Sequence, residues 1–127
     1  MVKSTDRGRT FTIVTSNLPD RHPTWAIVQD FVNPNLLFLD TEYGMFFTVD
    51  GGARWVQMNG GLPTIQVRDL DTQKRENDLV LGTFGRGFYV LDDYSAPRGV
   101  TAQTLSQRAN AYQYQYSMRT QIRATDW

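Results

Sequence analysis

The sequence predicts an all-β protein built from short antiparallel strands, and three observations lead to this fold class. Apolar and polar residues alternate with the two-residue period of a half-buried strand, as in Trp25 to Phe31. Breaks rich in Gly, Pro, Asn and Asp separate such runs, for example Asn33-Pro34-Asn35. A turn motif also recurs along the chain, and no stretch before residue 95 has helical periodicity.

The recurring motif reads [Ser/Thr]-x-Asp-x-Gly-x-x-[aromatic]. It occurs as Ser4 to Phe11 and again as Thr48 to Trp55, so that the two aspartates lie 44 residues apart. A Leu-Pro pair recurs at the same offset, at residues 18–19 and 62–63. Because two independent markers share one spacing, the sequence predicts a structural repeat of about 44 residues.

Short strands fill the repeat. We predict them at Phe11 to Val14, Trp25 to Phe31, Leu36 to Leu39, Met45 to Val49, Trp55 to Met58, Ile65 to Leu70, Leu79 to Leu81 and Phe88 to Leu91. Four-stranded units of roughly 40 to 45 residues are typical of β-propeller blades. The prediction is therefore a partial β-propeller of about two four-stranded antiparallel blades. It is too short to close a ring alone, since propellers have about four blades or more.

The chain divides into two compositional regions. Residues 1–94 carry the propeller blades, with one complete blade at 24–58 and, after it, three strands without the turn motif or a fourth strand. Residues 95–127 form a tail rich in Gln, Thr, Arg and Tyr, expected to be poorly ordered or to hold a short helix. That helix would run from Thr104 to Tyr112, with Thr104 as its cap and Gln107 three residues on. Alternation of tyrosine and glutamine suits an edge strand or disorder equally, at Tyr112, Tyr114 and Tyr116.

Composition excludes several classes of function. The 13 basic and 13 acidic residues balance, which argues against a nucleic-acid partner. The absence of cysteine excludes disulfides, thiolate metal sites and cysteine nucleophiles. No apolar stretch is long enough for a signal core or a membrane span, so no membrane partner is expected. The compartment stays open, because a longer parent protein would be free to carry an export signal.

The chemistry of the turn motif is structural. An aspartate in the turn can accept hydrogen bonds from backbone N–H groups of the next residues, and the hydroxyl two residues earlier can join the same loop. The glycine supplies a positive φ, and the aromatic residue is expected to fold onto the sheet against the next blade. The residues assigned this role are Ser4, Asp6, Gly8, Phe11, Thr48, Asp50, Gly52 and Trp55.

These residues resemble the Asp-box, or BNR repeat, of sialidase-like and sortilin (VPS10)-like propellers. Asn33 to Leu39, Thr48 to Gly52 and Arg75 to Gly87 are similar to segments of the last blades of large bacterial proteins labelled glycosyl hydrolase. The resemblance covers residues 1–98 and implies the fold rather than an activity, because Asp-boxes occur in propellers of many functions. Arg54 departs from the usual Thr or Lys, and the region after Arg98 lacks the further strands expected in such relatives.

Two functions follow from this resemblance. The first is a non-catalytic structural or binding scaffold, without cofactor, whose partners are the remaining blades, a second copy, or a protein or glycan ligand. The alternative is a part of a sialidase-like glycoside hydrolase with its catalytic residues largely outside this chain. Such enzymes use two carboxylates or a tyrosine nucleophile, and sialidases add an arginine triad. The candidates for that chemistry are Asp30, Glu42, Tyr43, Asp69, Asp71, Arg68 and Arg86, each of which also suits a solvated loop or strand end.

Three residues are the best candidates for facing a ligand, namely Arg86, Tyr43 and Glu42. Gly85-Arg86-Gly87 lacks the spacing and the following helix of a phosphate loop, so it is expected to connect two strands. His22 has no second imidazole or thiolate nearby in the sequence, and Asp92-Asp93 would point to opposite faces of a strand. No metal site and no complete catalytic site are predicted.

The structural role of the aspartate can be tested directly. Replacing Asp50 by Ala leaves backbone N–H groups of the turn unsatisfied, which is expected to lower the free energy of unfolding by about 1 to 3 kcal/mol. Denaturant unfolding of the two proteins measures the difference. Equal stability would contradict the assignment.

Overall fold

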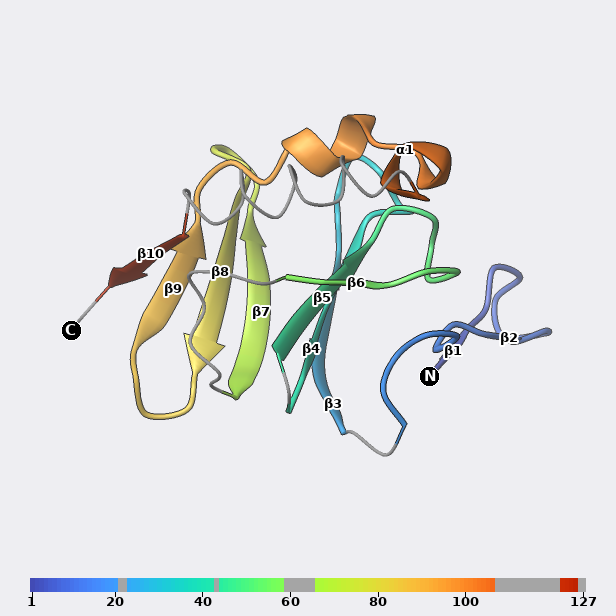
Figure 1. The fold of residues 1–127 in the computed structure, drawn as a ribbon, viewed down its shortest axis with the longest axis horizontal. Coiled ribbons are helices and arrows are strands. Elements are labelled where there is room, and N and C mark those ends of the chain that lie inside the picture. The colour runs from blue at the N-terminus through green and yellow to red at the C-terminus, as the bar shows by residue number, and fades with distance from the viewer. Residues whose placement is uncertain (21–22, 43, 59–65, 107–121, 126–127) are drawn as a thin grey trace.

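The structure, a computed structural model, describes all residues except 21–22, 43, 59–65, 107–121 and 126–127. Its sheets are antiparallel, and helix is confined in the described part to η1 (Ala96–Gly99) and α1 (Ala102–Ser106). Figure 1 shows the β1–β2 pair at one end of the molecule and β10 at the other, with strands β3 to β9 between them. The predicted all-β, partial propeller-like fold is present. The strands are β1 (Val2–Lys3), β2 (Thr12–Ile13), β3 (Thr24–Gln29), β4 (Leu37–Thr41), β5 (Gly44–Thr48), β6 (Val56–Gln57), β7 (Val67–Gln73), β8 (Asp78–Thr83), β9 (Phe88–Leu91) and β10 (Ile122–Thr125).

The first four-stranded sheet has its strands in chain order, β3-β4-β5-β6. The predicted apolar runs account for it, because β4 is buried along its whole length and β5 almost so. The β3–β4 ladder pairs Ile27 with Leu39 and has a bulge between Thr24 and Ala26. Each strand is joined to the next by a short connection, as in an up-and-down blade.

The second four-stranded sheet repeats this register. Leu70 pairs with Leu81 as Ile27 pairs with Leu39, and the bulge recurs between Val67 and Asp69, 43 residues after the first. The sheet has the order β10-β9-β8-β7, so β10 supplies a fourth strand on the outer edge of β9. The expectation that this unit lacks a fourth strand is therefore wrong.

The prediction missed β10 because of where it lies. Its four residues come from the tail, 31 positions after the end of β9 at Leu91, and the run Ile-Arg-Ala-Thr has only a weak apolar alternation. A strand whose partner is so distant in sequence cannot be placed by local pattern alone.

The N-terminal pair β1–β2 repeats the register of β5–β6. Val2 faces Ile13 and Lys3 faces Thr12; adding 44 to each number gives the pairs Phe46 with Gln57 and Phe47 with Val56, which are the pairs of β5 and β6. A backbone hydrogen bond follows the same rule, since Val14 N donates to Met1 O at 3.2 Å and Met58 N donates to Met45 O at 2.8 Å. The pair is therefore the outer half of a blade, and β1 was not predicted.

The hydrophobic core lies between the two four-stranded sheets. One face of the β3–β6 sheet packs against one face of the β7–β9 strands, and β3 contacts β7 most closely. Burial of these apolar faces drives the sheets together. The buried residues of this core are Leu36, Phe38, Met45, Phe47, Val49, Met58, Val67, Leu70, Leu79, Leu81, Leu91, Tyr94 and Val100.

The tail differs from its prediction in one further respect. The helix begins at Ala102 rather than after Thr104, because Thr101 is its cap: Thr104 N donates to Thr101 Oγ1 at 3.2 Å. The described part of the helix ends at Ser106, so the predicted continuation to Tyr112 and the alternating tyrosines lie outside the described residues, as does the second Leu-Pro marker.

Candidate functional site

The first repeat turn (residues 4–11) is organised by the carboxylate of Asp6. It accepts hydrogen bonds from the backbone N–H of Arg9 at 3.0 Å and of Thr10 at 2.8 Å, and from the hydroxyls of Ser4 and Thr10. Gly8 has a φ of +83° and donates its N–H to Ser4 Oγ at 2.7 Å. The hydrogen bonds from the side chain and N–H of Thr10 lower the pKa of Asp6 to about 2. The turn closes on an anionic aspartate.

The second repeat turn (residues 48–55) repeats three of these hydrogen bonds. Thr48 Oγ1 donates to Asp50 Oδ1 at 2.6 Å, Gly52 N donates to Thr48 Oγ1 at 3.2 Å, and Arg54 N donates to Asp50 Oδ1 at 3.0 Å. Each group is 44 residues after its counterpart in the first turn. Gly52 has a φ of +100°, and an added Cβ would lie 2.8 Å from the Cβ of Val14. Glycine is required here both for the backbone angle and for the approach of the preceding strand pair.

The aromatic residues of the two turns differ. Trp55 is 2% exposed, and its indole Nε1 donates to Val14 O at 2.7 Å. Asn17 completes this contact, since its side-chain amide exchanges two hydrogen bonds of 2.8 Å with the backbone of Trp55. The tryptophan is thus held by the preceding repeat rather than by the next one, which corrects the predicted direction of packing.

Phe11 does not fold onto the sheet as predicted. It is 64% exposed, and none of the described residues contacts it as Val14 and Asn17 contact Trp55 through hydrogen bonds. The aromatic position of this turn therefore needs a preceding strand pair for its burial.

A cluster of three side chains joins the two four-stranded sheets. We call it the Asp30 cluster (Asp30, Tyr94, Arg98). Asp30 follows β3 and has a fully buried side chain; Arg98 Nε and Nη2 donate to its two oxygens at 2.9 and 2.8 Å, and Tyr94 Oη donates at 2.8 Å. The N–H groups of Val32 and Asn33 donate to Oδ2 at 3.3 and 2.8 Å. The carboxylate therefore accepts five hydrogen bonds.

The electrostatics of the Asp30 cluster favour a structural role. Burial alone raises the pKa of Asp30, but the hydrogen bonds from Arg98, Asn33 N–H and Tyr94 outweigh it and lower the pKa to about 2. Burial and the neighbouring carboxylate raise the pKa of Tyr94 to about 12. A carboxylate so fully engaged has no capacity to take up a substrate's proton near neutral pH. Asp30, a candidate for the hydrolase chemistry, is thus a structural anion, and the expectation that it is solvated is wrong.

The Asp30 cluster was not apparent from the sequence. Tyr94 and Arg98 lie 64 and 68 residues after Asp30, and no local motif marks them. Only the repeat offers a signal, because Tyr94 follows Asp93 as Gly51 follows Asp50 in the preceding unit. In both units the backbone N–H at this position donates to the carbonyl of an asparagine, from Gly51 to Asn35 and from Tyr94 to Asn77.

The ligand-facing candidates lie at the opposite end of the sheets from the second repeat turn. Arg86 lies in the loop between β8 and β9, and Glu42 lies between β4 and β5; Figure 1 shows both loops at the lower ends of the strands. Both residues are exposed, and among the described residues no ion pair joins them. Tyr43 and His22 lie outside the described residues.

The same end of the sheets carries an exposed cation between aromatic rings. The guanidinium of Arg68 lies 4.4 Å from the ring centroid of Trp25 and 5.1 Å from that of Phe84. Phe84 and Trp25 are both exposed. Asp69 and Asp71, the other carboxylates considered for hydrolysis, are exposed on β7. This end therefore offers aromatic, cationic and anionic groups without an enclosed pair of carboxylates among the residues described.

No metal centre is formed by the described residues, in which no group of three or more His, Cys, Asp or Glu side chains converges. Asp93 instead caps its own turn, accepting hydrogen bonds from the N–H and hydroxyl of Ser95 that lower its pKa. Asp92 is half-buried at the end of β9.

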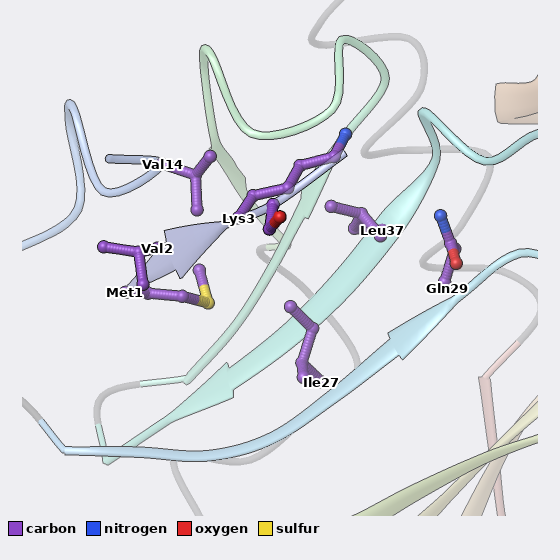
Figure 2. A pocket seen from close by; sticks show the side chains of 8 residues that line it. Met1, Val2, Lys3, Val14, Ile27, Gln29 and Leu37 are labelled. Atoms are coloured by element: carbon purple, nitrogen blue, oxygen red, sulfur yellow. The ribbon is translucent and has the colours of Figure 1, made fainter. Parts of the chain in front are cut away.

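A cavity of about 340 Å³ lies between β1 and the β3–β4 hairpin. Figure 2 shows side chains from both sides facing this space, which we call the N-terminal cavity. Its lining is mixed, with five apolar residues, Met1, Val2, Val14, Ile27 and Leu37, and three polar ones, Lys3, Ser4 and Gln29.

Asp40 is a buried carboxylate without a hydrogen-bond partner in the described part of the chain. It is the next-to-last residue of β4 and has no exposed surface, and neither of its oxygens accepts a hydrogen bond from a described residue. Burial raises its pKa to about 7, offset only in part by the nearby N–H groups of Thr41 and Val67. It follows the predicted strand Leu36 to Leu39, where alternation gave no sign of a buried charge.

Comparisons with protein-family models, with curated proteins and with solved structures found no match. In the described residues, no helix is both long and apolar enough to cross a membrane.

The Asp30 cluster predicts a large cost for removing Arg98. Replacing Arg98 by Met leaves a buried, unpaired carboxylate and is expected to lower the free energy of unfolding by about 3 to 5 kcal/mol. Arg75→Met is the matched control, because Arg75 pairs with Glu76 at 2.8 Å in full exposure and should cost about 0 to 1 kcal/mol. Urea unfolding measures both. Similar losses in the two variants would contradict the role of the cluster.

Asp40 predicts a loss of stability on raising the pH. Its folded-state pKa lies above the unfolded value of 3.8, so the fold binds this proton more tightly and stability falls as the pH rises from about 4 through 7. Asp40→Asn removes this dependence and should be more stable than the parent at pH 8 by on the order of 2 to 4 kcal/mol. Thermal or urea unfolding at pH 5 and pH 8 gives the comparison. A parent protein as stable at pH 8 as its Asn variant would refute the prediction.

Proposed function

We propose that this chain is a non-catalytic segment of a larger Asp-box propeller and serves as a structural or binding scaffold. The observation that carries the proposal is a set of three turn hydrogen bonds that occurs twice, with each donor and acceptor displaced by 44 residues. Repetition of a hydrogen-bond network together with its strand register supports a repeat architecture rather than a chance motif.

The two ends of the molecule support its place within a larger assembly. The β1–β2 pair has only the outer strands of a blade, and residues that are buried elsewhere in the repeat are exposed beside it. Large apolar side chains exposed over these strands include Val2, Phe11, Ile13 and Ile27. Exposed apolar surface of this extent is typical of a surface that binds another protein or another copy.

The other part of the proposal is a ligand surface at the end of the sheets that carries Arg86 and Glu42. Arg68 between Trp25 and Phe84 supports contact with a protein or a glycan, because aromatic rings and an arginine are favoured in such contacts. A hydrolase would need a catalytic pair of carboxylates in the same region. Asp30 lies at the opposite end of β3 and belongs to the structural cluster, and Asp40, two residues before Glu42, has no second buried carboxylate beside it among the described residues.

Sedimentation velocity tests the scaffold function. The chain is expected to form dimers or larger species as its concentration rises, because its open apolar faces then bind each other. Ile27→Lys, on the exposed face of β3, should shift the distribution toward monomer by at least about tenfold in the apparent dissociation constant. Glu76→Lys, in an exposed loop on the other sheet, is the matched control and should leave the distribution unchanged.

The contradicting outcome combines mass and activity. A chain that is monomeric at every concentration and hydrolyses fluorogenic glycosides, with turnover lost on Arg86→Ala, would overturn the scaffold function in favour of the hydrolase.

A further inference from the structure

We infer that the N-terminal cavity is the seat of a two-stranded antiparallel hairpin, equivalent in the repeat to β3 and β4, whose second strand extends the β1–β2 pair. The inference rests on the proposed function, because it takes the chain to be part of a larger propeller. It goes further by naming the surface that receives the next element and the chemistry of that element.

The register of β1 and β2 fixes their place in a blade. Their pairs lie 44 residues before the pairs of β5 and β6, which are the third and fourth strands of their sheet. In that sheet β4 pairs with the other edge of β5. The corresponding edge of β1 pairs with no strand among the described residues, so the position of a second strand is open there.

The interface between the two four-stranded sheets shows what covers the face of a first strand. Leu70 of β7 is 7% exposed, because it packs into the core between the sheets. The first sheet contributes to that core with Ala26 and Val28 of β3, Phe38 of β4 and Leu36, which precedes β4. Contact between β3 and β7 is the largest between the sheets. A first and a second strand of the preceding blade therefore provide this cover.

Ile27 is the counterpart of Leu70, and it lacks this cover. The two residues hold the same place in their ladders, opposite Leu39 and Leu81 respectively. Ile27 is nonetheless 49% exposed and lines the N-terminal cavity. Leaving an aliphatic side chain of this size in water is unfavourable relative to burying it, so the position favours a cover.

The other wall of the cavity already has its repeat partners in place. Met1 and Val14 correspond at offset 44 to Met45 and Met58, both of which lie in the core between the four-stranded sheets. Figure 2 shows Met1 and Val14 on the side of the cavity opposite Ile27 and Leu37. The part of the inter-blade interface that belongs to the third and fourth strands of a blade is thus formed by β1 and β2. The cavity corresponds to the part that belongs to the first and second strands.

The equivalence specifies the chemistry of the occupant. Its first strand should carry small or β-branched apolar residues where β3 has Ala26 and Val28, and its second strand large apolar residues where the repeat has Leu36 and Phe38. The occupant is polypeptide from another repeat of the same kind, because its second strand must also donate and accept the backbone hydrogen bonds of β1.

A fusion tests the inference. Gly44 corresponds at offset 44 to the position before Met1, so a copy of residues 24–44 placed directly in front of Met1 continues the repeat in register. The chain has no cysteine, so the substitution Ile27→Cys gives a single thiol whose labelling rate reports the exposure of the native position. We expect this thiol to label roughly tenfold more slowly, or slower still, in the fused chain than in the unfused chain, since burial by a docked hairpin must first be opened.

Three controls calibrate this result. In the first, the appended copy carries Lys at the positions of Val28 and Phe38, and the thiol of the Ile27→Cys variant should label as fast as in the unfused chain. In the second, Leu70→Cys in the unfused chain gives the slow rate of the covered equivalent position. In the third, Glu76→Cys in an exposed loop should label at the same rate with and without the fusion.

Each other outcome overturns the inference. Equal labelling of the Ile27→Cys variant with and without the appended copy means that the hairpin does not occupy the cavity. Equal protection by the Lys-bearing copy means that the cover is not the predicted apolar face. A fused chain that does not fold, as judged by near-ultraviolet circular dichroism, means that the copy does not complete the blade.

Sedimentation separates this test from that of the proposed function. If the unfused chain self-associates through the face of Ile27 while the fusion gives no protection, the scaffold function stands and the hairpin seat is wrong. If the fusion protects the thiol of the Ile27→Cys variant but the unfused chain is a glycoside-hydrolysing monomer, the seat stands and the scaffold function is wrong.

Discussion

The buried carboxylate of Asp30 fixes how the two four-stranded sheets sit against each other. Taking this charge out of water is costly, and the cost is offset by five hydrogen bonds from the groups around it, two of them from Arg98. Arg98 in turn donates to Asn77 in the turn before β8, and its guanidinium lies 4.8 Å from the ring centroid of Phe31. Through Arg98 and Tyr94, this anion connects the end of β3 with the β7–β8 turn and with the segment that follows β9.

The path of the chain after β9 depends on this arrangement. Tyr94 packs edge-on against Phe38 at 5.2 Å between centroids while its hydroxyl binds Asp30, so the ring serves the apolar core and the polar cluster at once. In the preceding repeat the same place holds Gly51, and the chain turns back at once into a fourth strand. In the second sheet the buried Tyr94 stands at this place, the chain continues through η1 and α1, and the fourth strand comes from residues 122–125.

Local features of the sequence predicted most of the fold, whereas contacts between residues far apart in the sequence were not predicted. The strands from Trp25 to Leu91 follow from alternation and turn residues, and the hydrogen bonds of the two turns follow from the spacing of a hydroxyl, an aspartate and a glycine. The exposure of Phe11 could not be predicted, because it depends on what precedes the strand pair and not on Phe11 itself. The Asp30 cluster and β10 join positions far apart in sequence, and no period or motif encodes such contacts. The burial of Asp40 inside an apolar strand violates the pattern that alternation relies on.

The contact of Trp55 gives the repeat a direction. Its indole is fixed by Val14 and its backbone by Asn17, both of which come from the strand pair before it. Each turn is therefore finished by its predecessor in the chain, and nothing in the turn itself can replace that neighbour. In a row of such units, order would spread from the N-terminal side toward the C-terminal side, as the blades leave the ribosome, and a damaged unit would weaken the one after it more than the one before.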